Sequence, residues 1–152
     1  MKTMNTILLI LIVAAGIFYL YQHREVPFEN VWNDALDKNE QIPGDEELRH
    51  ISIYYIKKAD NERGFTEKHL KIDDKQMVNE VMDQALGMTV KKARGISLDF
   101  DGLYIMDVKT NHAKYGIEFD EQGHMQVEGK YYEIEGENRL LKSLKPMDWE
   151  PR

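Results

Sequence analysis

The sequence predicts an α+β fold: a small, mainly antiparallel sheet with helices packed on one face, preceded by an N-terminal transmembrane helix. Three patterns lead to this expectation. Residues 4–21 contain no charged side chain, residues 74–86 carry apolar side chains at helical spacing, and later segments alternate apolar and polar residues. Helical and strand periodicities that occupy separate segments, rather than repeating βαβ units, are typical of the α+β class.

The N-terminal apolar run begins at Met4 and ends at Tyr21. As a helix it would extend roughly 27 Å at about 1.5 Å per residue, close to the ~30 Å hydrocarbon core, so the lipid bilayer is its predicted partner. Lys2 precedes the run and Arg24 follows it. The charge bias favours a single-pass protein of the cell membrane with a cytoplasmic N-terminus and an extracytoplasmic C-terminal domain. A signal peptide cleaved after residues 13–15 is the alternative.

These boundaries divide the chain into a transmembrane anchor at 1–24, a juxtamembrane short helix and linker at 25–47, and an acidic α+β domain at 48–152. Within the juxtamembrane segment, residues 30–37 have helical spacing of apolar side chains. Trp32 on this helix has two interpretations, a core residue packed on the domain or an interfacial anchor near lipid headgroups.

The first part of the domain is predicted to contain a hairpin and a helix. Residues 48–57 and 65–72 have the composition of strands, and residues 60–64 are typical of a turn. Residues 74–86 predict a helix with Asp73 as N-cap, Gln76 completing a capping box and Gly87 in a left-handed C-terminal position.

The second part alternates with period 2. It predicts a short strand near residue 90, further strands at 96–100, 103–109, 115–120, 124–127 and 131–134, and a last helix at 138–145. Asp101-Gly102 predicts a hairpin turn between the strands at 96–100 and 103–109.

The formal charge of −7 and the pI of about 5.2 argue against nucleic-acid binding, since such proteins neutralise phosphates with basic side chains. The charge divides into +2 for residues 1–24 and −9 for the remainder. The sequence has no cysteine, which excludes disulfides, thiolate metal sites and cysteine nucleophiles.

No arrangement typical of catalysis occurs in the sequence, which contains neither a Gly-x-Ser-x-Gly elbow nor a His-Glu-x-x-His run. Asp99 and Asp101 before Gly102 resemble the start of a calcium loop, but the third ligand and the distant glutamate are missing. A tight turn is the preferred interpretation, and we expect a non-enzymatic protein without a cofactor. The alternative is a hydrolytic or metal-dependent enzyme that uses carboxylates around Asp99, Asp101 and Asp120.

Two tyrosine doublets, Tyr54-Tyr55 and Tyr131-Tyr132, fall within predicted strands. Because adjacent strand residues face opposite sides, each doublet should bury one tyrosine and present the other. If the two outward tyrosines share a face, they form an aromatic patch of the kind favoured at binding surfaces. Ordinary tyrosines on a sheet surface are the alternative interpretation.

The chain combines one N-terminal helix with a cysteine-free acidic domain, and its ending has residues 129–134 (GKYYEI) before Leu140, Leu141 and Leu144. This layout resembles small membrane-anchored proteins of unknown function from Bacillus-like Gram-positive bacteria. The resemblance implies a cell-surface setting. We therefore expect a domain that binds a protein partner or a cell-envelope component, with a membrane-tethered regulator facing the cytoplasm as a further alternative.

Overall fold

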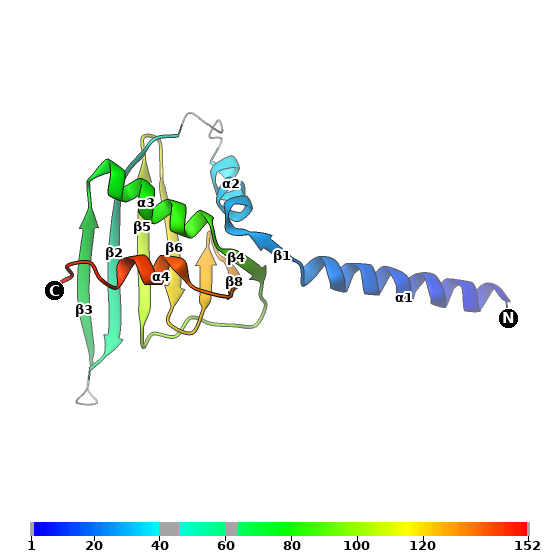
Figure 1. Cartoon of the computed structure of the whole chain (residues 1–152). Helices are drawn as coiled ribbons and strands as arrows, with labels where there is room; N and C mark the ends of the chain where they lie inside the picture. The colour runs from blue at the N-terminus through cyan, green and yellow to red at the C-terminus, as the bar shows by residue number, and fades with distance from the viewer. Residues whose placement is uncertain (1, 40–45, 60–63, 152) are drawn as a thin grey trace.

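The computed structural model describes residues 2–39, 46–59 and 64–151, whose arrangement is shown in Figure 1. The predicted linker residues 40–45 and residues 60–63 of the predicted turn lie outside this range. The described helices are α1 (Lys2–Gln22), α2 (Phe28–Lys38), α3 (Lys75–Leu86) and α4 (Arg139–Leu144). The strands are β1 (Glu25–Pro27), β2 (Leu48–Lys58), β3 (Phe65–Ile72), β4 (Thr89–Lys92), β5 (Leu103–Thr110), β6 (Lys114–Asp120), β7 (His124–Val127), β8 (Lys130–Glu135) and β9 (Glu150–Pro151).

The described strands form one nine-stranded sheet in the order β1-β4-β8-β7-β6-β5-β2-β3-β9. Every strand pair is antiparallel. The edge strands β1 and β9 have only three and two residues.

Helices α2, α3 and α4 cover one face of the sheet (Figure 1), and no described helix covers the other. We call these the covered face and the open face. Trp32 of α2 is only 5% exposed and its ring meets that of Tyr115 at 5.1 Å, so the interpretation of Trp32 as a core residue is confirmed. The covered-face core includes Phe28, Val31, Val78, Val81, Met82, Leu140 and Leu144 from the helices, and Ile51, Ile53, Met106, Val108, Ile117, Phe119 and Met125 from the strands.

The predicted transmembrane anchor is wrong. Among the described residues, no helix combines the length and the apolarity that crossing a membrane requires.

The correction extends to each expectation that depended on the anchor. The predicted fold class, a transmembrane helix followed by a small sheet, is replaced by a nine-stranded antiparallel sheet and four helices within the described residues. The predicted single-pass location in the cell membrane, with an extracytoplasmic domain, is wrong on the same finding.

Three local expectations also differ from the structure. Residues 96–100 form no strand, and Phe100 is 65% exposed, because the backbone N–H of Asp99 donates to the Asp120 carboxylate instead of to a neighbouring strand. The N-cap of α3 is Asp74, whose carboxylate accepts the N–H of Met77 at 2.9 Å. Gly87 has a φ of −77°, so the expected left-handed position is not used.

Candidate functional site

The two tyrosine doublets divide between the faces of the sheet in the same way. In β2, Ile53 is fully buried and Tyr55 lies on the same covered face, which puts Tyr54 on the open face. In β8, Tyr132 is 6% exposed and belongs to the core, and Tyr131 is therefore on the open face. The structure thus places Tyr54 and Tyr131 on one face, as the patch hypothesis requires.

The strand register places these two tyrosines at the ends of one lateral row. Tyr54 pairs with Ile105, Ile105 with Glu118, Glu118 with Gln126, and Gln126 with Tyr131. We call these five residues the tyrosine row. At about 4.8 Å per strand, four strand spacings separate the tyrosines by about 19 Å. They therefore do not touch, and a partner would have to span the row to contact both.

At one end of the row, the Tyr54 ring is held by its cross-strand neighbour. It stacks on the His69 ring with a centroid distance of 4.7 Å and an interplanar angle of 27°. The Nε2 atom of His69 is in turn 2.9 Å from the Ser52 hydroxyl oxygen. These contacts orient the Tyr54 ring before any partner binds, which reduces the entropy lost on association.

The middle of the row is hollowed. Gly116, Glu118, Gln126, Glu128 and Gly129 line a depression of about 170 Å³. A Cβ atom added at Gly116 would meet nothing within 4 Å, so the missing side chain leaves open space on this face. Because Glu118 and Glu128 are the charged residues of the lining, the hollow suits a cationic side chain better than an anionic one.

A salt bridge lies beside the hollow on the same face. Lys114 Nζ is 2.8 Å from Asp107 Oδ2, and Asp107 pairs with Gly116 across the β5–β6 ladder. The hydrogen bond to Asp107, together with its negative charge, raises the pKa of Lys114. The pair thus presents opposite charges next to each other beside the hollow.

The other tyrosine of each doublet contributes to the core. The hydroxyls of Tyr55 and Tyr104 both donate to Glu121 Oε1 at 3.3 Å, and both rings pack against Trp149. Burial is the main cause of the raised pKa of Tyr55 and of Tyr132. Tyr55 and Tyr132 therefore stabilise the fold from the covered face.

The carboxylates considered for metal binding serve the backbone instead. Asp120 is fully buried, and its two oxygens accept hydrogen bonds from the N–H groups of residues 99, 122 and 124 and contact the His124 ring at 3.0 Å. Asp99 accepts from the N–H of Asp101, and Asp101 accepts from the N–H of Lys58. Within the described part of the chain, no group of three or more His, Asp or Glu side chains is placed to hold a metal ion.

Sequence reasoning did not identify the central residues of the row. Ile105, Glu118 and Gln126 lie on three different strands, and each belongs to an ordinary alternating pattern. Only the register between strands shows that they lie between Tyr54 and Tyr131. Gly116 is the one residue whose type was a signal, because glycine inside a strand leaves an opening on the sheet surface.

The fold defines the described part of this chain as an α+β domain whose antiparallel sheet has its helices α2, α3 and α4 on one side. It matches no protein-family model, and comparison with curated proteins and with solved structures finds no significant match. The resemblance to small Bacillus-like proteins therefore stays a prediction.

Proposed function

We propose that this chain is a non-enzymatic binding domain that holds a protein partner on the open face of its sheet, with Tyr54 and Tyr131 as the main contacts. The observation that carries the proposal is the register, which sets the two tyrosines on the same face at the two ends of one row. Tyrosine is enriched at interfaces because its ring supplies apolar area and its hydroxyl a hydrogen bond.

The composition of the row supports a protein as the partner. It combines two aromatic side chains, one aliphatic side chain at Ile105, and the polar Glu118 and Gln126, all of them partly exposed. A mixture of aromatic, aliphatic and hydrogen-bonding groups is typical of protein interfaces. The five neighbouring strands β2, β5, β6, β7 and β8, with β5 eight residues long, span roughly 500 Å², which is more than half of the ~800 Å² that one partner commonly buries.

The enzymatic alternative has less support. A hydrolase needs converging acid and base groups in a recess that excludes water. Here Asp99, Asp101 and Asp120 accept backbone hydrogen bonds, and the hollow at Glu118 is shallow and open. These carboxylates hold turns in place, which is a structural role.

The test compares proteins that copurify with the full chain and with a Tyr54→Ala, Tyr131→Ala double variant. We expect a specific partner to be lost from the double variant. The matched control is Met77→Ala, which removes an apolar side chain that is 42% exposed on α3, on the covered side of the sheet. A partner retained by the double variant at wild-type levels would contradict the proposal.

A further inference from the structure

A second surface, distinct from the open face, lies where the segment after α1 meets the sheet. Two neighbouring clefts open there, of about 310 and 340 Å³, and Lys92 lines both of them. The clefts are lined by five cationic side chains and two carboxylates, a local surplus of three positive charges on a chain whose formal charge is −7. The cations are Arg24, Lys91, Lys92, Arg94 and Lys130, and the carboxylates are Asp34 and Glu133.

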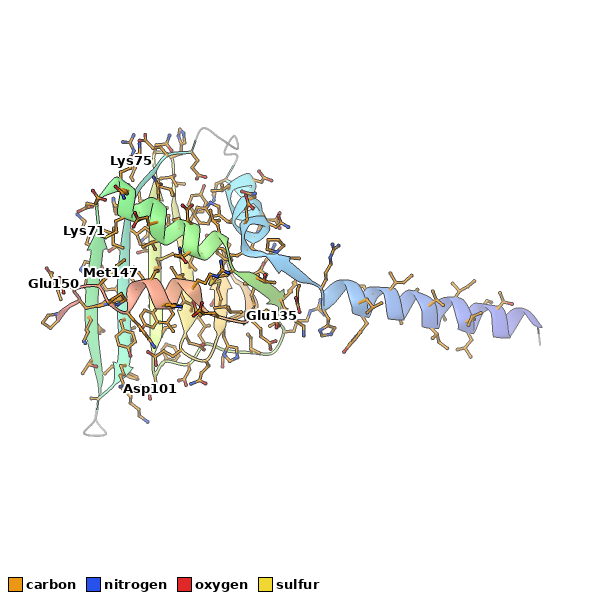
Figure 2. All side chains as sticks on the ribbon, viewed as in Figure 1. Lys71, Lys75, Asp101, Glu135, Met147 and Glu150 are labelled. Atoms are coloured by element: carbon orange, nitrogen blue, oxygen red, sulfur yellow. The ribbon has the colours of Figure 1, made fainter. Side chains whose placement is uncertain are left out.

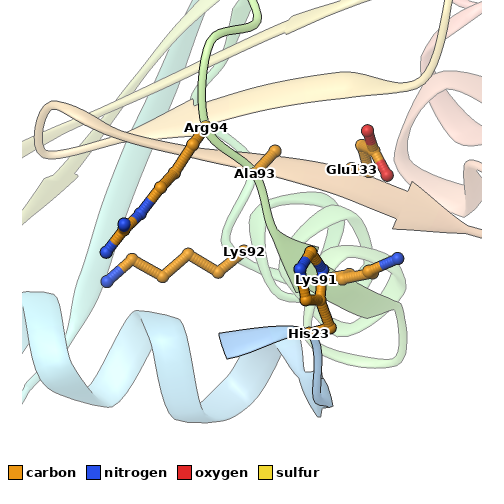
Figure 3. A pocket seen from close by; sticks show the side chains of 6 residues that line it. All are labelled: His23, Lys91, Lys92, Ala93, Arg94 and Glu133. Carbon is orange, nitrogen blue, oxygen red and sulfur yellow. The ribbon is translucent and has the colours of Figure 1, made fainter. Parts of the chain in front are cut away.

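The strand register explains why four of these cations converge. The N–H of Ala93 donates to the carbonyl of Tyr131 at 2.9 Å, so the extended backbone of β4 continues beyond Lys92. Lys92 and Arg94, two residues apart, therefore project to the same side. Figure 3 shows the two side chains extending together, with their charged ends near each other.

The neighbouring strands add one cation each. Lys92 pairs with Tyr132 and Glu25 pairs with Lys91. Continuing these antiparallel registers places Lys130 opposite Arg94, and Arg24 opposite Lys92. Like charges directly opposite each other in a sheet are destabilising, so this arrangement costs stability unless a counter-charge is present.

The protein itself supplies little counter-charge. None of the salt bridges among the described residues involves Arg24, Lys92, Arg94 or Lys130. By contrast, Lys71 and Lys75 each pair with a carboxylate, Lys71 with Asp73 and Lys75 with Glu47. The cations at the clefts thus repel one another, and a bound anion would relieve that repulsion.

We propose that these four cations form a binding site for a phosphate-bearing anion. Guanidinium and ammonium groups donate charge-assisted hydrogen bonds to phosphate oxygens, and Arg can do so in a bidentate manner. The second cleft also contains Phe18, Val26 and Tyr132, which give the site an apolar side for the organic part of a ligand. This inference does not depend on the proposed role of the open face.

The test measures binding to the full chain by calorimetry, with inorganic pyrophosphate as the free phosphate and monomeric dihexanoyl phosphatidylglycerol as a phosphate carried by a lipid. Dihexanoyl phosphatidylcholine is the comparison without net charge. Lys92→Gln with Arg94→Gln should weaken binding at least about tenfold, because two charge-assisted hydrogen bonds are lost. Pyrophosphate should also raise the melting temperature of the wild type and not that of this variant.

The control is Lys71→Gln with Lys75→Gln, which changes the net charge equally. Figure 2 shows both lysines at the end of the molecule farthest from α1. If the wild type and the control variant bind pyrophosphate and the Lys92 and Arg94 variant does not, the site takes free phosphate. If the same variants differ in this way in binding phosphatidylglycerol, and none of them binds pyrophosphate, the phosphate belongs to a lipid. No binding of either probe, or equal weakening by the control variant, would overturn the proposal.

Discussion

Replacing the tyrosines of the second doublet one at a time should separate binding from stability. Tyr132 is 6% exposed and packs in the core beside Met125, its partner on β7. Removing a buried aromatic side chain costs about 3–5 kcal/mol of unfolding free energy. At roughly 3–5 °C per kcal/mol for a domain of this size, Tyr132→Ala should lower the melting temperature by about 9–25 °C.

Tyr131→Ala should behave in the opposite way. Its side chain lies on the open face, so the free energy of unfolding should change by less than about 1 kcal/mol. Binding of the partner should weaken at least about tenfold, as expected when an aromatic interface residue is truncated. Thermal unfolding followed by circular dichroism measures the first quantity, and titration with the purified partner measures the second. If Tyr131→Ala unfolds the domain as strongly as Tyr132→Ala, the assignment of the two faces is wrong.

Three further substitutions test the structural roles assigned above. Asp120→Ala should lower the free energy of unfolding, measured by urea titration, by about 3–5 kcal/mol, because three backbone N–H groups and the His124 ring lose their acceptor. A loss below about 1 kcal/mol would refute this structural role of Asp120. Gly102→Ala should lower the free energy of unfolding by about 1–2 kcal/mol in the same assay, since φ of Gly102 is +102° and an added Cβ would lie 2.9 Å from Glu121 Cγ. An unchanged free energy of unfolding would mean that the turn adapts freely. Burial raises the pKa of Glu46 above its usual 4.5, so the folded state binds a proton at this carboxyl more tightly than the unfolded state does. The folded state therefore loses stability as the pH rises from 4.5 to the raised pKa of Glu46. Glu46→Gln should therefore raise the melting temperature at pH 7, with a gain that vanishes below pH 4.5, and an equal gain at all pH values would contradict the burial argument.

Much of the secondary structure was predictable because its signals are local. The predicted strand at 65–72 coincides with β3, and the predicted helix at 74–86 differs from α3 by one residue. Strands β1 and β9 were missed, since three and two residues are too few to show an alternating pattern. The segment at 96–100 alternates like a strand, but a long-range hydrogen bond to Asp120 holds it as a loop.

The candidate site was predictable only in part. Strand alternation alone indicates that one tyrosine of each doublet faces outward, and the structure identifies them as Tyr54 and Tyr131. The row between them depends on register over five strands, which short-range patterns do not determine. The cationic clefts depend on register in the same way, because Arg24 and Lys130 are far apart in sequence and each looks like an ordinary surface residue.

Site-specific photo-crosslinking can show whether the open face of the sheet binds a protein partner. A photoreactive residue replaces Gln126, in the middle of the tyrosine row, or Asp83, which is exposed on α3 on the covered side. We expect a discrete adduct with one protein from position 126, none from position 83, and loss of the adduct when Tyr54→Ala and Tyr131→Ala are added. Equal adducts from both positions, or an adduct from position 126 that persists without the two tyrosines, would contradict this expectation.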